Sequence, residues 1–262
     1  MTSFESMLRW AELGENRYTN SIPASWAQGR ATFGGLVTAA GVRLVRRLVH
    51  NARIVRSVDT QFLGPVKAEV PVVAETELLR EGRFMTQAET RFSQDGALCA
   101  RVTTTFGAPR DSALVVRAPS RAPTPPEGIA VGYIEGVSPA FLQHMALRWS
   151  VGEPPFTGAA EALCGGHCRH GTEARGDEAV LGLLDAWPAP VLPMAQGGAM
   201  ASTVRWTAHL VGDAPPPEAW CFFEARAVTA GDGYASTLGH LYGPDGALVA
   251  WMEQLVAVFD KV

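Results

Sequence analysis

The sequence predicts an α+β fold of two similar halves, each consisting of a helix followed by about four antiparallel strands. Three observations support this prediction. The tetrapeptide DGAL occurs at 95–98 and again at 245–248, with strand-like segments on both sides of each copy. A segment with helical spacing of apolar residues precedes each copy, and a proline-rich segment separates the halves. A length of 262 residues with 47% hydrophobic residues suits two domains of roughly 100–150 residues with a substantial core.

The first half begins with a helix predicted over 33–49. Its apolar residues recur at mostly helical spacing, whereas three arginines face elsewhere. Alternation of apolar and polar residues predicts strands at 57–66 and 70–80. The segment 82–106 has the pattern of a strand, an Asp-Gly turn and a second strand, which indicates a β-hairpin.

The second half repeats this order. A helix is predicted over 177–187, because Asp177 and Glu178 favour the positive end of a helix and Pro188 blocks its continuation. Strands are predicted at 202–212 and 219–228, followed by a second hairpin over 232–256. The segment 139–171 would supply the opening strands of this half.

The proline-rich segment 117–128 is predicted to connect the halves. It contains four prolines, which lack the N–H group that a strand inside a sheet must donate. We therefore expect an N-terminal unit at 1–116, a connector at 117–128 and a C-terminal unit at 129–262.

Composition excludes several classes of protein. A net charge of −4 and a pI of about 5.9 give no electrostatic reason to expect nucleic-acid binding. The longest apolar runs fall well short of the ~20 residues that cross a bilayer, and the N-terminal segment lacks the apolar stretch of a secretion signal. Four cysteines in a chain of this length do not indicate a disulfide framework. We therefore expect a cytoplasmic protein with no membrane partner.

The stretch CGGHCRHG at 164–171 raises the question of a metal site. Structural zinc sites usually bring together two pairs of ligands from separate turns. Here two cysteines and two histidines fall within seven residues of a strand-like segment, and neighbouring strand residues point to opposite faces. We therefore expect neither a metal nor another cofactor.

Three polar residues of the second half stand among apolar ones. Gln254 lies in the middle of the last strand, where burying its amide without a partner would cost roughly 1–3 kcal/mol. Asp185 lies late in its helix, where desolvation and the helix dipole would both raise the pKa of a carboxyl group. Thr203 opens the following strand with a hydroxyl group that can bind water. Each also fits a structural role, as a bonded amide, a solvated or capping carboxylate and an ordinary strand threonine. Gly35 lies 150 residues before Asp185, so the repeat predicts this acid in one half only.

Several segments, in this order and spacing, resemble double hot-dog acyl-CoA thioesterases of the thioesterase II-like family. In the first half they are 18–45, which contains the FGGL sequence, 55–66 and 78–98. In the second half they are LLDAWPAPVL at 183–192, ASTVRW at 201–206 and DGALVAWMEQLVAVF at 245–259. The resemblance covers nearly the whole chain, from 18 to 260. It implies a tandem hot-dog fold in which each unit is a long helix wrapped by a curved antiparallel sheet.

The resemblance also implies an activity and its residues. The family's catalytic set corresponds to Asp185, Thr203 and Gln254, which would hold one water molecule for attack on the thioester carbonyl. The glycine pair Gly34 and Gly35 would lie near the thioester, where backbone N–H groups can stabilise the oxyanion. The expected substrate is a medium- to long-chain acyl-CoA, converted to free acid and CoA without a cofactor. Exposed faces of hot-dog sheets often associate, so a homo-oligomer is also an expectation.

Two alternatives stay open on the same scaffold. A hot-dog hydratase or dehydratase would use an Asp/His pair near the helix, but no histidine accompanies Asp185 in the sequence. A non-catalytic protein that binds acyl-CoA or acyl chains would keep the fold without the chemistry. A serine thioesterase is disfavoured because the sequence contains no G-x-S-x-G motif.

Overall fold

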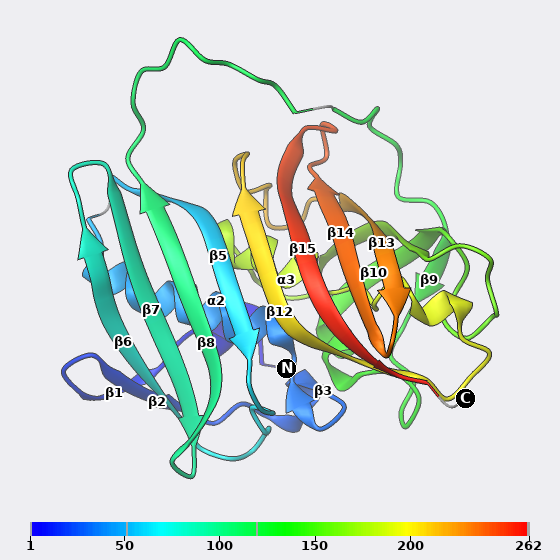
Figure 1. Cartoon of the computed structure of the whole chain (residues 1–262), viewed down its shortest axis with the longest axis horizontal. Helices are drawn as coiled ribbons and strands as arrows, with labels where there is room; N and C mark the ends of the chain where they lie inside the picture. The colour runs from blue at the N-terminus through cyan, green and yellow to red at the C-terminus, as the bar shows by residue number, and fades with distance from the viewer. Residues whose placement is uncertain (1, 51, 119, 261–262) are drawn as a thin grey trace.

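A computed structural model describes residues 2–50, 52–118 and 120–260, and its main feature is one continuous antiparallel sheet (Figure 1). The helices are α1 (Phe4–Met7), α2 (Gly34–Val45) and α3 (Gly176–Leu184), with 3₁₀ turns η1 (Ala24–Trp26), η2 (Arg46–Leu48), η3 (Ala140–His144) and η4 (Leu192–Met194). The strands are β1 (Ala11–Gly14), β2 (Arg17–Asn20), β3 (Ala27–Gln28), β4 (Ala31–Thr32), β5 (Ile54–Phe62), β6 (Val72–Glu81), β7 (Met85–Gln94), β8 (Ala97–Gly107), β9 (Ile129–Val131), β10 (Met145–Val151), β11 (Leu163–His170), β12 (Met200–Leu210), β13 (Cys221–Gly231), β14 (Tyr234–Tyr242) and β15 (Leu248–Phe259).

The order of strands reflects the repeat predicted from the sequence. Across the sheet it is β1-β2-β6-β7-β8-β5 in the first half and β12-β15-β14-β13-β11-β10-β9 in the second, so that β5 and β12 join the halves at the centre (Figure 1). Asp59 of β5 lies opposite Thr207 of β12, whose hydroxyl donates to the Asp59 carboxylate at 2.9 Å. The two halves run outward from this junction in corresponding order. A large antiparallel sheet with a few separate helices confirms the predicted α+β class.

Helices α2 and α3 pack on one face of the sheet and against each other. Helix α2 covers β6, β7 and β8, and helix α3 covers β11, β14 and β15. Near the end of α2, the Arg43 side chain pairs with Glu178 at 2.7 Å and with Glu5 at 2.9 Å, and Arg46 pairs with Asp177 at 3.2 Å. Glu5 belongs to α1, whereas Asp177 and Glu178 lie in the first turn of α3. Helices α2 and α3 are therefore antiparallel, and the start of α2 faces the end of α3.

The helices differ in length from the prediction. Helix α2 has 12 residues and continues as a 3₁₀ turn, within the predicted range of 33–49. Helix α3 has nine residues and ends at Leu184, so the second half lacks the long helix expected for each unit. Asp185 therefore follows the helix at its C-cap position and does not belong to the helix. None of the described helices is long and apolar enough to cross a membrane.

The predicted strands are all present, with bounds shifted by up to four residues. Residues 108–118 and 120–128 lie between the last strand of the first half and β9, outside the helices and strands (Figure 1). Among them, the backbone N–H of Arg121 donates to the Gly246 carbonyl at 2.8 Å, which holds the predicted connector against the β14–β15 loop. Pro119, which belongs to this predicted connector, lies outside the described residues.

Candidate active site

The centre of the candidate site is a hydrogen bond between two of the predicted residues. The Gln254 side chain, in the middle of β15, donates from Nε2 to Asp185 Oδ1 at 3.1 Å. Asp185 reaches β15 because it stands directly after α3, which packs on that strand. Gln254 is 9% exposed, and the hydrogen bond to Asp185 gives the NH₂ group of its buried amide a partner.

Protein atoms surround the Asp185 carboxyl group, although part of the residue reaches the surface. Desolvation raises the pKa of this carboxyl group from 3.8 to about 7, and hydrogen bonds from the Gly35 backbone and the Gln254 amide oppose the shift. The end of α3 carries a negative partial charge, which also disfavours a carboxylate, whereas the positive start of α2 favours it. The result is a carboxyl group that takes up and releases a proton near neutral pH.

The glycine pair permits the start of α2 to approach this acid. A Cβ atom on Gly34 would lie 2.8 Å from Asp185 Oδ2 and 3.0 Å from the ring of Phe62. A Cβ atom on Gly35 would lie 3.1 Å from Asp185 Cβ and 2.7 Å from the ring of Phe33. Any side chain at either position would therefore push the helix and the carboxylate apart.

The N–H groups at the start of α2 have different partners. The N–H of Phe33 donates to the Trp26 carbonyl at 2.9 Å, and those of Leu36 and Val37 donate to the Phe33 carbonyl. The Gly35 backbone N–H is directed to Asp185. Among the described residues, no acceptor bonds the N–H of Gly34. This donor, beside the carboxylate, is thus available to a bound group.

Thr203 faces the same side of the sheet as Gln254 because of a β-bulge. It lies opposite Val256 of β15, whereas Trp206 lies opposite Gln254, and the register shifts between Thr203 and Arg205. Without this extra residue, Thr203 would point to the opposite face from Trp206. Thr203 is half-buried, and within the described chain it forms no hydrogen bond to Asp185 or Gln254. Diagonal neighbours on adjacent strands are separated by ~7–8 Å, which a water molecule can bridge.

The spacing of 150 residues predicts that Gly35 is the counterpart of Asp185 in the first half. The structure shows that the two residues occupy different positions. Gly35 lies in the first turn of α2, and Asp185 follows the last turn of α3. The helices are placed differently relative to the strands in the two halves, so equal spacing along the chain does not give equivalent positions. The two residues are direct neighbours instead, and the site combines elements of both halves.

The first half lacks the polar residues of the site. Thr104 of β8 lies in the register position that matches Gln254, since DGAL aligns the two strands. Val55 of β5 precedes a corresponding bulge and so matches Thr203. The first half therefore has valine where the second has Thr203, and threonine where the second has the amide of Gln254.

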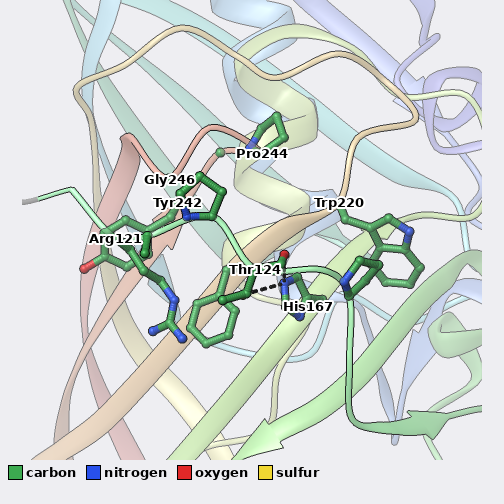
Figure 2. Close-up of a pocket in the computed structure, with 12 residues that line it drawn as sticks. Arg121, Thr124, His167, Trp220, Tyr242, Pro244 and Gly246 are labelled. Atoms are coloured by element: carbon green, nitrogen blue, oxygen red, sulfur yellow. Dashed lines mark hydrogen bonds between the residues drawn. The ribbon is translucent and has the colours of Figure 1, made fainter.

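A hollow of about 270 Å³ lies elsewhere, where the connector crosses the second half (Figure 2). Its polar groups already hold the connector in place. The Arg121 guanidinium lies 3.5 Å from the centre of the Phe222 ring and pairs with Glu224, and His167 Nε2–H donates to the Thr124 carbonyl at 3.1 Å. The hollow contains none of the predicted catalytic residues. We interpret it as the packing interface between the connector and the sheet.

The CGGHCRHG segment forms β11, and its side chains diverge. The Cys164 thiol contacts the Pro188 carbonyl, and the His170 ring lies against Phe4 on the helix side, whereas His167 faces the connector on the other side. In the described part of the chain no three His, Cys, Asp or Glu side chains are grouped as a metal site.

Comparison with known proteins identifies the family of the chain. The model of the acyl-CoA thioesterase N-terminal domain matches residues 22–107, and that of the C-terminal domain matches residues 116–258. No curated protein matches the sequence.

Solved structures resemble the whole chain. A putative thioesterase II from Thermobifida fusca YX is 24% identical, with a TM-score of 0.83 and coverage of 98% of this chain and 99% of that one. A conserved protein of unknown function with a hot dog fold from Alicyclobacillus acidocaldarius is 22% identical, with a TM-score of 0.83 and coverage of 99% and 98%. Acyl-CoA thioesterase II TesB2 from Mycobacterium marinum is 19% identical, with a TM-score of 0.77 and coverage of 98% and 97%. At these identities the likeness establishes the hot-dog fold.

Proposed function

This chain belongs to the acyl-CoA thioesterase family of thioester hydrolases, and we propose that it hydrolyses a medium- to long-chain acyl-CoA to free acid and CoA by general-base activation of water. The observation that carries this mechanism is the hydrogen-bonded pair of Asp185 and Gln254. A carboxyl group whose pKa is about 7 matches the work of a general base at neutral pH.

In this mechanism Asp185, Thr203 and Gln254 hold one water molecule. Asp185 removes a proton from the water while the water oxygen attacks the thioester carbonyl carbon. The resulting tetrahedral intermediate collapses, the carbon–sulfur bond breaks, and the CoA thiolate receives the proton from Asp185. Thioesters are already activated, so an oriented water and a base suffice without an acyl-enzyme.

The N–H group of Gly34 is the proposed donor to the developing oxyanion. The hydrogen bonds at the start of α2 favour it over Gly35, whose N–H is directed to Asp185. An N–H group at a helix N-terminus combines a hydrogen bond with the positive end of the dipole. Gly35 would instead stabilise the carboxylate form of the base.

The finer architecture is part of the same proposal. We propose two tandem hot-dog units, at 1–116 and 129–262, joined by the connector at 117–128. The mirrored strand order and the two matched family domains support this division. The four cysteines are buried free thiols, which supports a reducing, cytoplasmic location. Self-association through the exposed sheet face is proposed as well.

The acyl chain would extend into the apolar layer between α2 and the sheet. Nearly every residue of α2 is buried there, and the residues from Leu36 to Val45 are small or aliphatic except for Arg43. Such a surface favours medium- and long-chain acyl groups over charged acyl groups. We therefore propose a role in fatty acid metabolism.

A thiol-release assay across acyl lengths from acetyl to palmitoyl, on both CoA and carrier-protein thioesters, tests this proposal. We expect turnover by the native protein and a loss of about 10²–10⁴-fold in Asp185→Asn, with binding of a non-hydrolysable acyl-CoA ether retained. Binding without any turnover by the native protein would favour the non-catalytic alternative. Hydration of an enoyl-CoA in place of hydrolysis would favour the hydratase.

A further inference from the structure

Thr237 of β14 has a buried hydroxyl group next to the proposed site. Its side chain is 1% exposed, and Oγ1 has no hydrogen-bond partner among the described residues. Thr237 lies directly opposite Gln254 of β15. Residues opposite each other on antiparallel strands share a face, with Cβ atoms ~4.5–5.5 Å apart.

The Gln254 amide has an unmatched atom on its side as well. Its NH₂ group donates to Asp185, but no donor in the described chain bonds its carbonyl oxygen. On the other flank of Gln254 lies Trp206, whose indole N–H is directed to Met252 Sδ at 3.1 Å. Thr237 is therefore the neighbour that can supply a hydrogen bond to this oxygen.

The first half shows that the strand pairing alone does not demand this hydroxyl. Thr104, in the position that matches Gln254, lies opposite Ala88. The second half, which contains Asp185 and Gln254, thus has a threonine hydroxyl opposite the amide. The first half lacks this acid and amide and has the methyl group of Ala88 at the opposed position.

We propose that Thr237 is a positioning residue whose hydroxyl donates to Gln254 Oε1 and so fixes the amide with its NH₂ group toward Asp185. The proposal requires the rotamer of Thr237 in which the hydroxyl group faces this oxygen across the opposed pair. An amide can exchange the places of its oxygen and nitrogen by turning over, which would direct the oxygen at the Asp185 carboxylate and repel it. A donor on the oxygen prevents that arrangement. The inference rests on the proposed function.

The test compares Thr237→Val, Thr237→Ser and Thr104→Val. Valine keeps the shape of threonine and removes the hydroxyl. Thr104→Val is the matched control, because Thr104 is also fully buried and its hydroxyl has no partner among the described residues, but β8 lies three strands away from β15 in the sheet. We expect Thr237→Val to lower kcat by about 3- to 10-fold, the factor that one hydrogen bond between neutral groups controls. Thr237→Ser retains native kcat, and Thr104→Val leaves kcat unchanged.

The pH dependence separates positioning from a structural role. The Gln254 hydrogen bond lowers the pKa of Asp185, so loosening it raises that pKa further. In Thr237→Val we expect the acid limb of the kcat/KM profile to move to higher pH, and serine to restore it. The ¹³C-carboxyl NMR titration of Asp185, assigned with Asp185→Asn, should move in the same direction.

Two results would overturn the inference. One is a native kcat and an unmoved Asp185 titration in Thr237→Val. The other is an equal change in Thr104→Val. If the native protein released no thiol from any thioester, the proposed function would fail, and the NMR titration would still decide whether Thr237 orients the amide.

Discussion

Replacement of Asp185 by asparagine should stabilise the protein at alkaline pH, because it removes a desolvated charge. Asparagine has nearly the shape of aspartate and can still bond Gln254. The pKa of the Asp185 carboxyl group is raised from 3.8 in the unfolded chain to about 7 in the folded one. Between these values the folded state binds a proton that the unfolded state has lost, so the contribution of Asp185 to stability falls as pH rises.

The magnitude follows from the shift. About three pKa units at about 1.4 kcal/mol each give about 4 kcal/mol, which is an upper limit because part of Asp185 reaches the surface. This stability is fully present below pH 3.8, decreases from there to about pH 7, and is absent above. The asparagine variant lacks the decrease altogether. Its advantage over the native protein should therefore grow with pH up to about neutrality and then level off.

Guanidinium denaturation of both proteins at intervals from pH 5 to pH 8.5 measures this difference. We expect the advantage of Asp185→Asn to increase by up to about 3 kcal/mol over that range. Asp95→Asn is the control for the lost charge, because Asp95 is exposed in a turn with a φ of 51°, where asparagine is equally suited. A difference between native protein and Asp185→Asn that did not vary with pH would refute the desolvation of this carboxyl group.

Two further predictions concern the surroundings of the site. Gly34→Ala should lower kcat by about 100-fold, since the added methyl would displace Asp185. Gly64→Ala is the control and should leave kcat unchanged, because no heavy atom lies within 4 Å of its Cβ position. Equal kcat values for both variants in the thiol-release assay would contradict this. Arg43→Met should lower the free energy of unfolding by about 1–3 kcal/mol, because Glu178, with a side chain 11% exposed, would lose its partner. An unchanged free energy of unfolding in urea denaturation would contradict this prediction.

The strands could be predicted because their signals are local. Alternation and the Asp-Gly turn act within a few residues, and Asp95 and Gly96 have φ values of 51° and 79°, as the turn at that hairpin requires. The short strands β1, β2 and β9 at the sheet edges were not predicted. Pairing with a neighbour, rather than their own pattern, determines these edge strands.

The site was only partly predictable, because some of its features depend on local sequence and others on contacts between distant segments. Asp185 and Gln254 could be proposed from local surroundings and family resemblance, and the structure brings them into contact. The inward direction of Thr203 depends on a bulge that no residue type signals. The approach of Gly35 to Asp185 and the pairing of Thr237 with Gln254 depend on contacts between distant segments.

The dependence of kcat/KM on pH, measured for the native protein and Asp185→Asn with one good acyl-CoA substrate, tests the central claim most directly. The claim predicts that the native value rises tenfold per pH unit below about pH 7 and levels off above it, as the carboxylate form of Asp185 accumulates. It predicts for Asp185→Asn a value lower by about 10²–10⁴-fold that does not follow this curve. Hydrolysis by Asp185→Asn at close to the native rate, with the same acid limb, would show that another group is the base.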